Sequence, residues 1–189
     1  MMKISRTARF VGFDFRRDNK AVAAVEFAVI LPVMLLMFFG TVELSSAVSA
    51  SRKVTQMAST LADLTSQSTT VAIGDLNNFF GAAGAIMTPY LTPPTQARIS
   101  QLYIDPTTHQ AIVKWSKVSS VTTTLTPRAL NSIVTIPATL AIDGTYLIFS
   151  EVSYKYMPAA GYVIPGGVTL SDVGYARPRY SDSVACSTC

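Results

Sequence analysis

One long apolar segment near the N-terminus constrains this sequence more than any other feature. Residues 21–42 contain a single charged side chain, Glu26, and residues 27–42 contain none. A helix that crosses a bilayer needs about 20 apolar residues, so this segment is long enough to span a membrane once. Pro32 lies early in it, where a membrane helix tolerates a proline with a local kink. The segment therefore predicts a single-pass anchor.

The charge distribution agrees with an anchor and not with a nucleic-acid-binding surface. Residues 1–20 hold six basic and two acidic side chains, so the net charge of +4 belongs to this tail. Basic residues beside a span mark its cytoplasmic side, whereas nucleic-acid recognition needs basic residues spread over a folded face. The sequence therefore predicts a basic cytoplasmic leader over 1–20, a domain on the other side of the membrane, and no nucleic-acid partner.

Glu26 is the unusual residue of the anchor. Placing a charged side chain at the middle of a membrane costs about 2.5–3.5 kcal/mol of free energy. Glu26 is therefore expected either to stay hydrated at the interface or to pair with a cation. Cleavage between Ala21 and Val22 would create a mostly charged α-amine at Val22, four residues before Glu26. Two other interpretations remain open, namely a cleavable secretory signal with a small-residue site near residues 48–50, and an uncleaved signal anchor.

The sequence around Glu26 resembles a known family. RRD at residues 16–18 precedes a run of small residues, which is followed by AVEFA at 24–28, LP at 31–32 and an apolar helix. This combination, over residues 16–50, is similar to the TadE/TadG-like proteins, the minor pilins or pseudopilins of the Tad branch of type IV pili. A looser resemblance lies near the C-terminus, in EVSYKYMP, IPGG and YARPRYSDSVAC.

The resemblance implies a processing site and an assembly site. A prepilin peptidase would cut between Ala21 and Val22, although the family usually has glycine where this chain has Ala21. Glu26 would then be the fifth residue of the mature chain, followed by Phe27, and would set the register against other pilin helices.

The resemblance also implies partners and a location. The implied partners are other Tad pilins and pseudopilins, the inner-membrane assembly platform and the prepilin peptidase. The implied location is a bacterial inner membrane, with the N-terminus in the cytoplasm and the C-terminal domain in the periplasm, at the base of the pilus or in its fibre. The same resemblance associates the chain with Flp pili and cell adhesion.

Beyond the span, the pattern predicts a stalk helix and a second helix. The first helix is expected to run from residue 21 to 67 and to pack on the domain or on a neighbour through an apolar seam. The seam consists of Ala47, Ala50, Val54, Met57, Leu61 and Leu64. The polar stretch 66–75 breaks the helix. Asp75 is expected to N-cap the second helix, which would bury Leu76, Phe79, Phe80, Ala83 and Met87.

From residue 96 the pattern changes to strands. Residues 96–105 and 110–118 flank a PTTH turn and predict a hairpin, while 145–157 and 167–178 predict a third and a fourth strand. A short helix is expected over 122–130. The expected fold class is α+β, with a long N-terminal helix followed by a small antiparallel β-sheet domain over 75–189.

No arrangement of residues predicts an enzyme. His109 lies in a turn, and the sequence has no phosphate-binding glycine loop. Cys186 and Cys189, at the C-terminal end, are too few for a structural zinc site, which needs four ligands. No metal and no cofactor are therefore expected. The two cysteines are interpreted as a disulfide with each other, as a link between subunits or, less favourably, as a redox pair.

The sequence therefore predicts a membrane-anchored minor pilin-like subunit that acts in assembly of a Tad-type pilus through helix–helix association. The alternative is an uncleaved single-pass protein whose periplasmic domain binds a ligand or a surface. A third interpretation, an anchored envelope enzyme, has only the C-x-x-C sequence in its favour.

Overall fold

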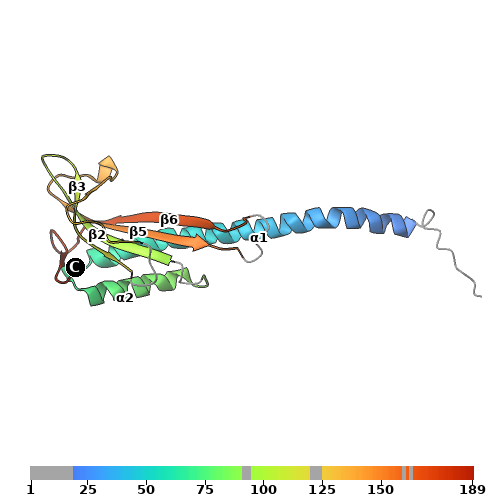
Figure 1. Cartoon of the computed structure of the whole chain (residues 1–189), viewed down its shortest axis with the longest axis horizontal. Helices are drawn as coiled ribbons and strands as arrows, with labels where there is room; N and C mark the ends of the chain where they lie inside the picture. Colours follow the sequence, from blue (N-terminus) through green and yellow to red (C-terminus); the bar gives the residue numbers. More distant parts are fainter. Residues whose placement is uncertain (1–18, 91–94, 120–124, 159–160, 162–163) are drawn as a thin grey trace, which may run out of the picture.

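The longest element of the computed structural model is helix α1 (Asn19–Ser66), which has 48 residues and is therefore about 72 Å long. One half of α1 projects as a rod, and the other half lies along a sheet (Figure 1). The structure describes residues 19–90, 95–119, 125–158, 161 and 164–189. The predicted long N-terminal helix is confirmed, whereas the predicted leader falls, apart from its last two residues, outside the described residues.

The second half of α1 is held in place by an apolar stripe at helical spacing. Ala50, Val54 and Leu61 are almost inaccessible to solvent, because they face the sheet at every turn. The predicted seam positions Ala47, Ala50, Val54, Met57 and Leu61 are all buried, and Leu64 is half-buried. Ala58 and Ala62 widen the stripe, and their small side chains let the sheet approach the helix closely.

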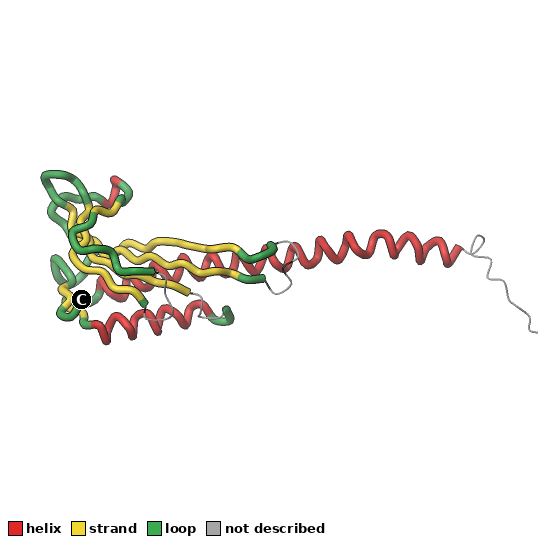
Figure 2. The backbone as a smooth tube through the Cα atoms, in the orientation of Figure 1, coloured by secondary structure: helices red, strands yellow, loops and turns green. Residues whose placement is uncertain are grey.

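The sheet is antiparallel and has its strands in the order β4-β3-β2-β5-β6. Its strands are β2 (Thr95–Ile104), β3 (Ala111–Val118), β4 (Ile133–Val134), β5 (Tyr146–Tyr156) and β6 (Val168–Ala176). β2 and β3 form the predicted hairpin, and β5 and β6 are the predicted third and fourth strands (Figure 2). The predicted α+β fold is therefore confirmed.

The sheet buries apolar side chains on both faces, because successive residues of a strand point to opposite sides. Ile148 and Val152 of β5 face the helices. Leu147 and Phe149 of the same strand point the other way and pack against a second cluster. Residues 134–141, which include the short 3₁₀ helix η2 (Ala138–Leu140), cover that second cluster.

Helix α2 (Ile73–Gly84) runs beside the packed half of α1 and continues into the 3₁₀ helix η1 (Ala85–Met87) (Figure 1). The sequence predicted that Asp75 N-caps α2, and this prediction is wrong. Ala72 is the N-cap, and Asp75 Oδ2 accepts a hydrogen bond from the Ala72 N–H at 2.9 Å. A carboxylate in the first turn still satisfies a backbone donor that has no helical partner.

Two further differences concern short segments. The prediction of a helix over 122–130 is wrong for the residues that the structure describes. Residues 125–129 have no regular structure, and residues 130–131 form a turn. Pro127 lacks the backbone donor that a helix would use. A two-stranded parallel sheet of β1 (Thr70–Val71) and β7 (Ala185–Cys186) was not predicted, because two residues are too few to show an alternating pattern.

Candidate functional site

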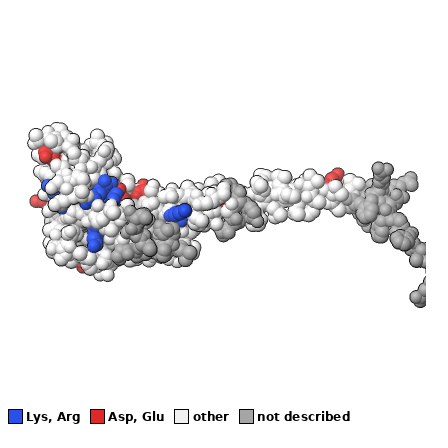
Figure 3. All heavy atoms as spheres, viewed as in Figure 1, with Lys and Arg blue, Asp and Glu red and all other residues white. Residues whose placement is uncertain are grey.

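The candidate functional site is the half of α1 that projects beyond the sheet. Every residue from 22 to 39 is exposed, including large apolar side chains such as Phe27, Leu36 and Phe38. Figure 3 shows this half of the helix almost without charged atoms. Among the described helices α1 is long and apolar enough, by length and composition, to cross a membrane. Such a surface marks contact with lipid or with other apolar helices.

Glu26 interrupts this apolar surface near its N-terminal end. Its side chain is exposed, as is that of Phe27. Val22 lies four residues before Glu26, so the two residues share one face of the helix. The bond between Ala21 and Val22 lies within the first turn of α1, which begins at Asn19. The proposed roles of these residues remain predictions, because each of them depends on a second protein.

A second carboxylate, which the sequence pattern did not indicate as a site, lies where α1 meets the sheet. Glu43 is 4% exposed, and its Oε2 accepts a hydrogen bond from the Ile164 N–H at 3.3 Å. Ile164 lies between β5 and β6 in the sequence, and it therefore reaches the level at which the exposed half of α1 ends. A charge directly after an apolar run suggests a solvated interface, and no local pattern indicates that a turn 121 residues later covers it.

Beyond this junction, close backbone approaches fix α1 to the sheet. Ser150 Oγ of β5 donates a hydrogen bond to the Ala58 carbonyl oxygen at 2.5 Å. Gly174 of β6 lies over the same carbonyl, so a Cβ there would be 2.4 Å from the Ala58 oxygen. Two polar pairs add to this contact, Thr55 with Asp172 and Arg179 with Asp63. The position of the projecting half is therefore set by the packed half.

On the opposite face of the sheet, two arginines share one carboxylate. Glu151 accepts hydrogen bonds from Arg98 Nε at 2.7 Å and from Arg128 Nη2 at 2.8 Å. Arg98 and Glu151 are directly opposed in β2 and β5, and the Arg128 guanidinium lies over the Phe149 ring. Burial disfavours the charged form of Glu151, but the hydrogen bonds from both arginines outweigh it and lower the pKa of this carboxyl. This cluster holds the segment around Arg128 against the sheet.

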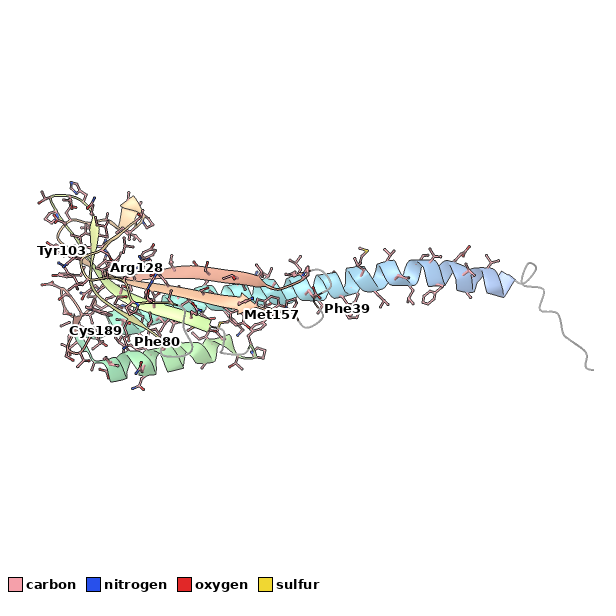
Figure 4. The ribbon with its side chains drawn as sticks, viewed as in Figure 1. Phe39, Phe80, Tyr103, Arg128, Met157 and Cys189 are labelled. Carbon is pink, nitrogen blue, oxygen red and sulfur yellow. A yellow bond between two sulfur atoms is a disulfide. The ribbon has the colours of Figure 1, made fainter. Side chains whose placement is uncertain are left out.

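The cysteine pair lies at the far end of the molecule from the projecting helix (Figure 4). Cys186 and Cys189 form a disulfide, with their Cα atoms 5.5 Å apart. Thr188, between them, accepts a hydrogen bond on its Oγ1 from the Ile73 N–H at 3.0 Å. The disulfide loop therefore lies at the N-terminus of α2, although no helix adjoins it in the sequence. Glu26 and the cysteines belong to opposite ends of the protein.

His109 lies in an exposed turn and contacts Asp143 through Nδ1 at 2.7 Å. Within the part of the chain that the structure describes, no group of three or more His, Cys, Asp or Glu side chains could hold a metal ion. The chemistry that the candidate site offers is therefore that of an apolar helix with one exposed carboxylate.

Comparison with protein families matches residues 21–63 to the TadE-like protein family. The predicted resemblance is therefore confirmed over a segment that includes the exposed half of α1 and most of its packed half. Comparison with curated proteins and with solved structures gave no match. The match relates the chain to the Tad pilus machinery in general and agrees with an N-terminal membrane anchor.

Proposed function

We propose that this TadE-like chain is a minor pilin-like subunit that acts in assembly of a Tad-type pilus, and that it works by association and not by catalysis. The observation that carries the proposal is the exposed apolar half of α1, with Glu26 one turn from Val22, inside the segment that matches the family. In this proposal α1 anchors the protein in the bacterial inner membrane, with residues 1–20 in the cytoplasm and the sheet domain in the periplasm.

The proposed association uses Glu26 as a register-setting charge. After cleavage between Ala21 and Val22, the new α-amine at Val22 has a pKa of about 7.7–8.0 and is mostly charged at neutral pH. The amine and the carboxylate are each costly in apolar surroundings, and pairing offsets most of that cost. If Glu26 of one subunit meets the amine of a neighbour, the contact is head-to-tail, and such contacts generate helical filaments. The proposed partners are other Tad pilins and pseudopilins, with the assembly platform and the prepilin peptidase acting on them.

The decisive experiment compares crosslinking of this protein to the other pilins in cells that carry wild type or Glu26→Gln. We expect Glu26→Gln to insert and fold normally, because the exposed half of α1 is remote from the sheet, and to lose crosslinks and piliation several-fold. Thr41→Val is the matched control, since Thr41 Oγ1 donates to the Met37 carbonyl of its own helix at 2.8 Å. Unchanged crosslinking in Glu26→Gln would show that Glu26 is an ordinary interfacial carboxylate.

The processing step has its own measurement. Intact-mass analysis of the membrane-extracted protein should show the loss of residues 1–21, and Ala21→Gly should be cut at least as completely. A mature chain that starts at Ser51 would instead favour a secretory signal. A chain that retains Met1 or Met2 would favour the alternative function, an uncleaved single-pass protein with a periplasmic binding domain.

Orientation can be measured independently of processing. A membrane-impermeant thiol reagent, applied to cells whose outer membrane is permeabilised and whose inner membrane is intact, should label Thr139→Cys, whose position is exposed on the domain. It should not label Ser5→Cys in the leader when cleavage is blocked. Labelling of Ser5→Cys alone would place the domain in the cytoplasm and overturn the proposed orientation.

A further inference from the structure

We infer that the domain has a second membrane contact beside its anchor: the end of the domain nearest the projecting helix rests in the lipid interface. This membrane-proximal end is defined by Leu44 and Val48 of α1 and by Met157 and Val168, which flank the turn between β5 and β6. The inference rests on the membrane-anchor part of the proposed function, but not on cleavage, pilin partners or Glu26.

The membrane-proximal end exposes large apolar side chains. Leu44 is 62% exposed and Met157 is 58% exposed, and Val48 and Val168 are also exposed. Figure 4 shows Met157 at the end of β5, beside α1, with Phe39 a little further along the helix toward the projecting half. The apolar surface of the anchor therefore does not stop where the domain begins, but continues onto the domain.

Three contacts fix the level of Ile164 and of the end of β5 along α1. Ile164 in the turn donates its N–H to Glu43. The Tyr156 ring, next to Met157, lies 6.1 Å from the Tyr90 ring, and Tyr90 Oη donates to the Ser46 carbonyl at 2.9 Å. Ile164 and the end of β5 are thus level with the segment of α1 between Glu43 and Ser46.

The thickness of a bilayer places its outer boundary close to this same segment of α1, between Glu43 and Ser46. A hydrocarbon core of about 30 Å takes about 20 helical residues. If the charged Glu26 marks the inner boundary, the outer boundary falls at about residue 46, within the membrane-proximal end. If the core begins at Val22, the outer boundary falls at about residue 42, and the membrane-proximal end lies in the headgroup layer.

The position of Glu43 agrees with this depth. A carboxylate at the edge of the hydrocarbon would be costly if it faced lipid. Glu43 is instead buried and accepts a hydrogen bond from the Ile164 N–H. Ile164 therefore bonds the carboxylate at the end of the span, while Met157 and Val168, on either side of Ile164 in the sequence, expose apolar side chains.

The nearest exposed charges lie further out. Residues 44–51 and 157–167 contain no charged side chain. Arg52, the next charge along α1, is nine residues after Glu43 and therefore about 14 Å beyond it. A headgroup layer is about 5–8 Å thick on each side, so Arg52 clears it. Lys155, which is exposed on β5 two residues before Met157, has a side chain long enough to reach lipid phosphates.

The test uses the full chain in phosphatidylcholine vesicles whose acyl chains carry bromine, which quenches tryptophan fluorescence at short range. The natural Trp115 is buried and bonds the Val184 carbonyl, so it gives the baseline. We expect Met157→Trp to be quenched at least twofold more strongly than wild type. Leu130→Trp is the matched control, because Leu130 is 67% exposed on a turn in the segment before β4 and should stay at the baseline.

Three outcomes would decide against the inference. Equal quenching of Met157→Trp and Leu130→Trp would show that the turn stays in water. Weak quenching of Met157→Trp that rises when the protein is diluted tenfold in lipid would show that a second copy covers it. If Met157→Trp does not fold, Val168→Trp replaces it, and baseline quenching there would equally overturn the inference. The result is independent of Glu26→Gln crosslinking, so this inference and the assembly proposal can fail separately.

Discussion

At the residue scale, α1 carries two glutamates whose surroundings differ completely. Glu26 is exposed on the projecting half, whereas Glu43 is buried and bonds the Ile164 N–H. Both are visible in the sequence as charges near the ends of one apolar run, yet only Glu26 was predicted to have a role. The pattern shows where a charge lies along a helix, but it does not show that the Ile164 N–H, 121 residues later, bonds Glu43.

Glu151 makes the stability of the domain depend on pH. Its folded-state pKa is lowered, so its contribution is fully present above the unfolded pKa, near the ordinary value of 4.5, and is lost as the pH falls through the folded value. We expect Glu151→Gln to reduce the free energy of unfolding at pH 7 by about 1–3 kcal/mol, because both arginines lose a charged partner. The difference between wild type and variant should shrink below pH 4.5.

The measurement is urea unfolding in mild detergent at pH 7, 5 and 3.5. Asp143→Asn is the control, since the His109–Asp143 pair is largely exposed and an exposed pair contributes at most about 1 kcal/mol. If the Glu151→Gln difference were the same at every pH, the ionised state of Glu151 would not contribute to stability.

Gly174 sets the distance between α1 and β6. A Cβ at this position would lie 2.4 Å from the backbone oxygen of Ala58, which cannot move without shifting the helix. Gly174→Ala should therefore lower the free energy of unfolding by about 1–3 kcal/mol through overpacking. Gly81→Ala in α2 is the matched control, because a Cβ there meets nothing within 4 Å. We expect it to be neutral or to stabilise by up to about 1 kcal/mol. A Gly174→Ala protein as stable as wild type would contradict this packing.

At the element scale, the sequence predicted those elements whose own pattern is long enough to be read. The stripe from Ala47 to Leu61, the β2–β3 hairpin, and β5 and β6 all have clear periodicity and were predicted correctly. The two-residue strands β1 and β7 were not, because they depend on pairing between residues far apart in the sequence. The N-cap of α2 was predicted at Asp75 and not at Ala72, because a first-turn carboxylate that accepts a backbone N–H has the same sequence signature as an N-cap.

The C-terminal disulfide loop stabilises the start of α2. The Cys186→Ser/Cys189→Ser double variant should lose at most about 2 kcal/mol, because the closed loop is very short. The loss should be local, with faster hydrogen exchange at the amides of Ile73 and Ser187, which donate to Thr188 Oγ1 and to the Val71 carbonyl. Thr188→Val keeps the disulfide and removes only the bond to Ile73, so only the Ile73 amide should exchange faster. On a non-reducing gel, the wild-type protein should run as a monomer. A dimer that dissociates when it is reduced would instead favour a disulfide between subunits.

At the scale of the whole molecule, the protein is a rod joined to a sheet domain, with the C-terminus at the end of the domain away from the projecting helix (Figure 1). The exposed half of α1 and the packed half differ in their neighbours and not in their helical structure. The first buried residue of the described chain is Glu43, so the core of the domain begins where the apolar run of the anchor ends. This division predicts that the anchor is dispensable for folding, although the proposed function depends on it.

Truncation tests this division. A chain of residues 39–189 should fold in water with the same circular dichroism and with a melting temperature within a few degrees of that of the full chain in detergent, because residues 22–38 are exposed throughout. A chain of residues 55–189 is the control: it lacks Glu43, Ala47, Ala50 and Val54, which leaves the helix-facing side of the sheet partly uncovered, and it should be unfolded or aggregated. If 39–189 failed to fold while the full chain was stable in detergent, the exposed half of α1 would contribute to the domain, and the loss of crosslinking expected for Glu26→Gln could then arise from misfolding. If 39–189 folds, that loss can be assigned to the membrane helix alone.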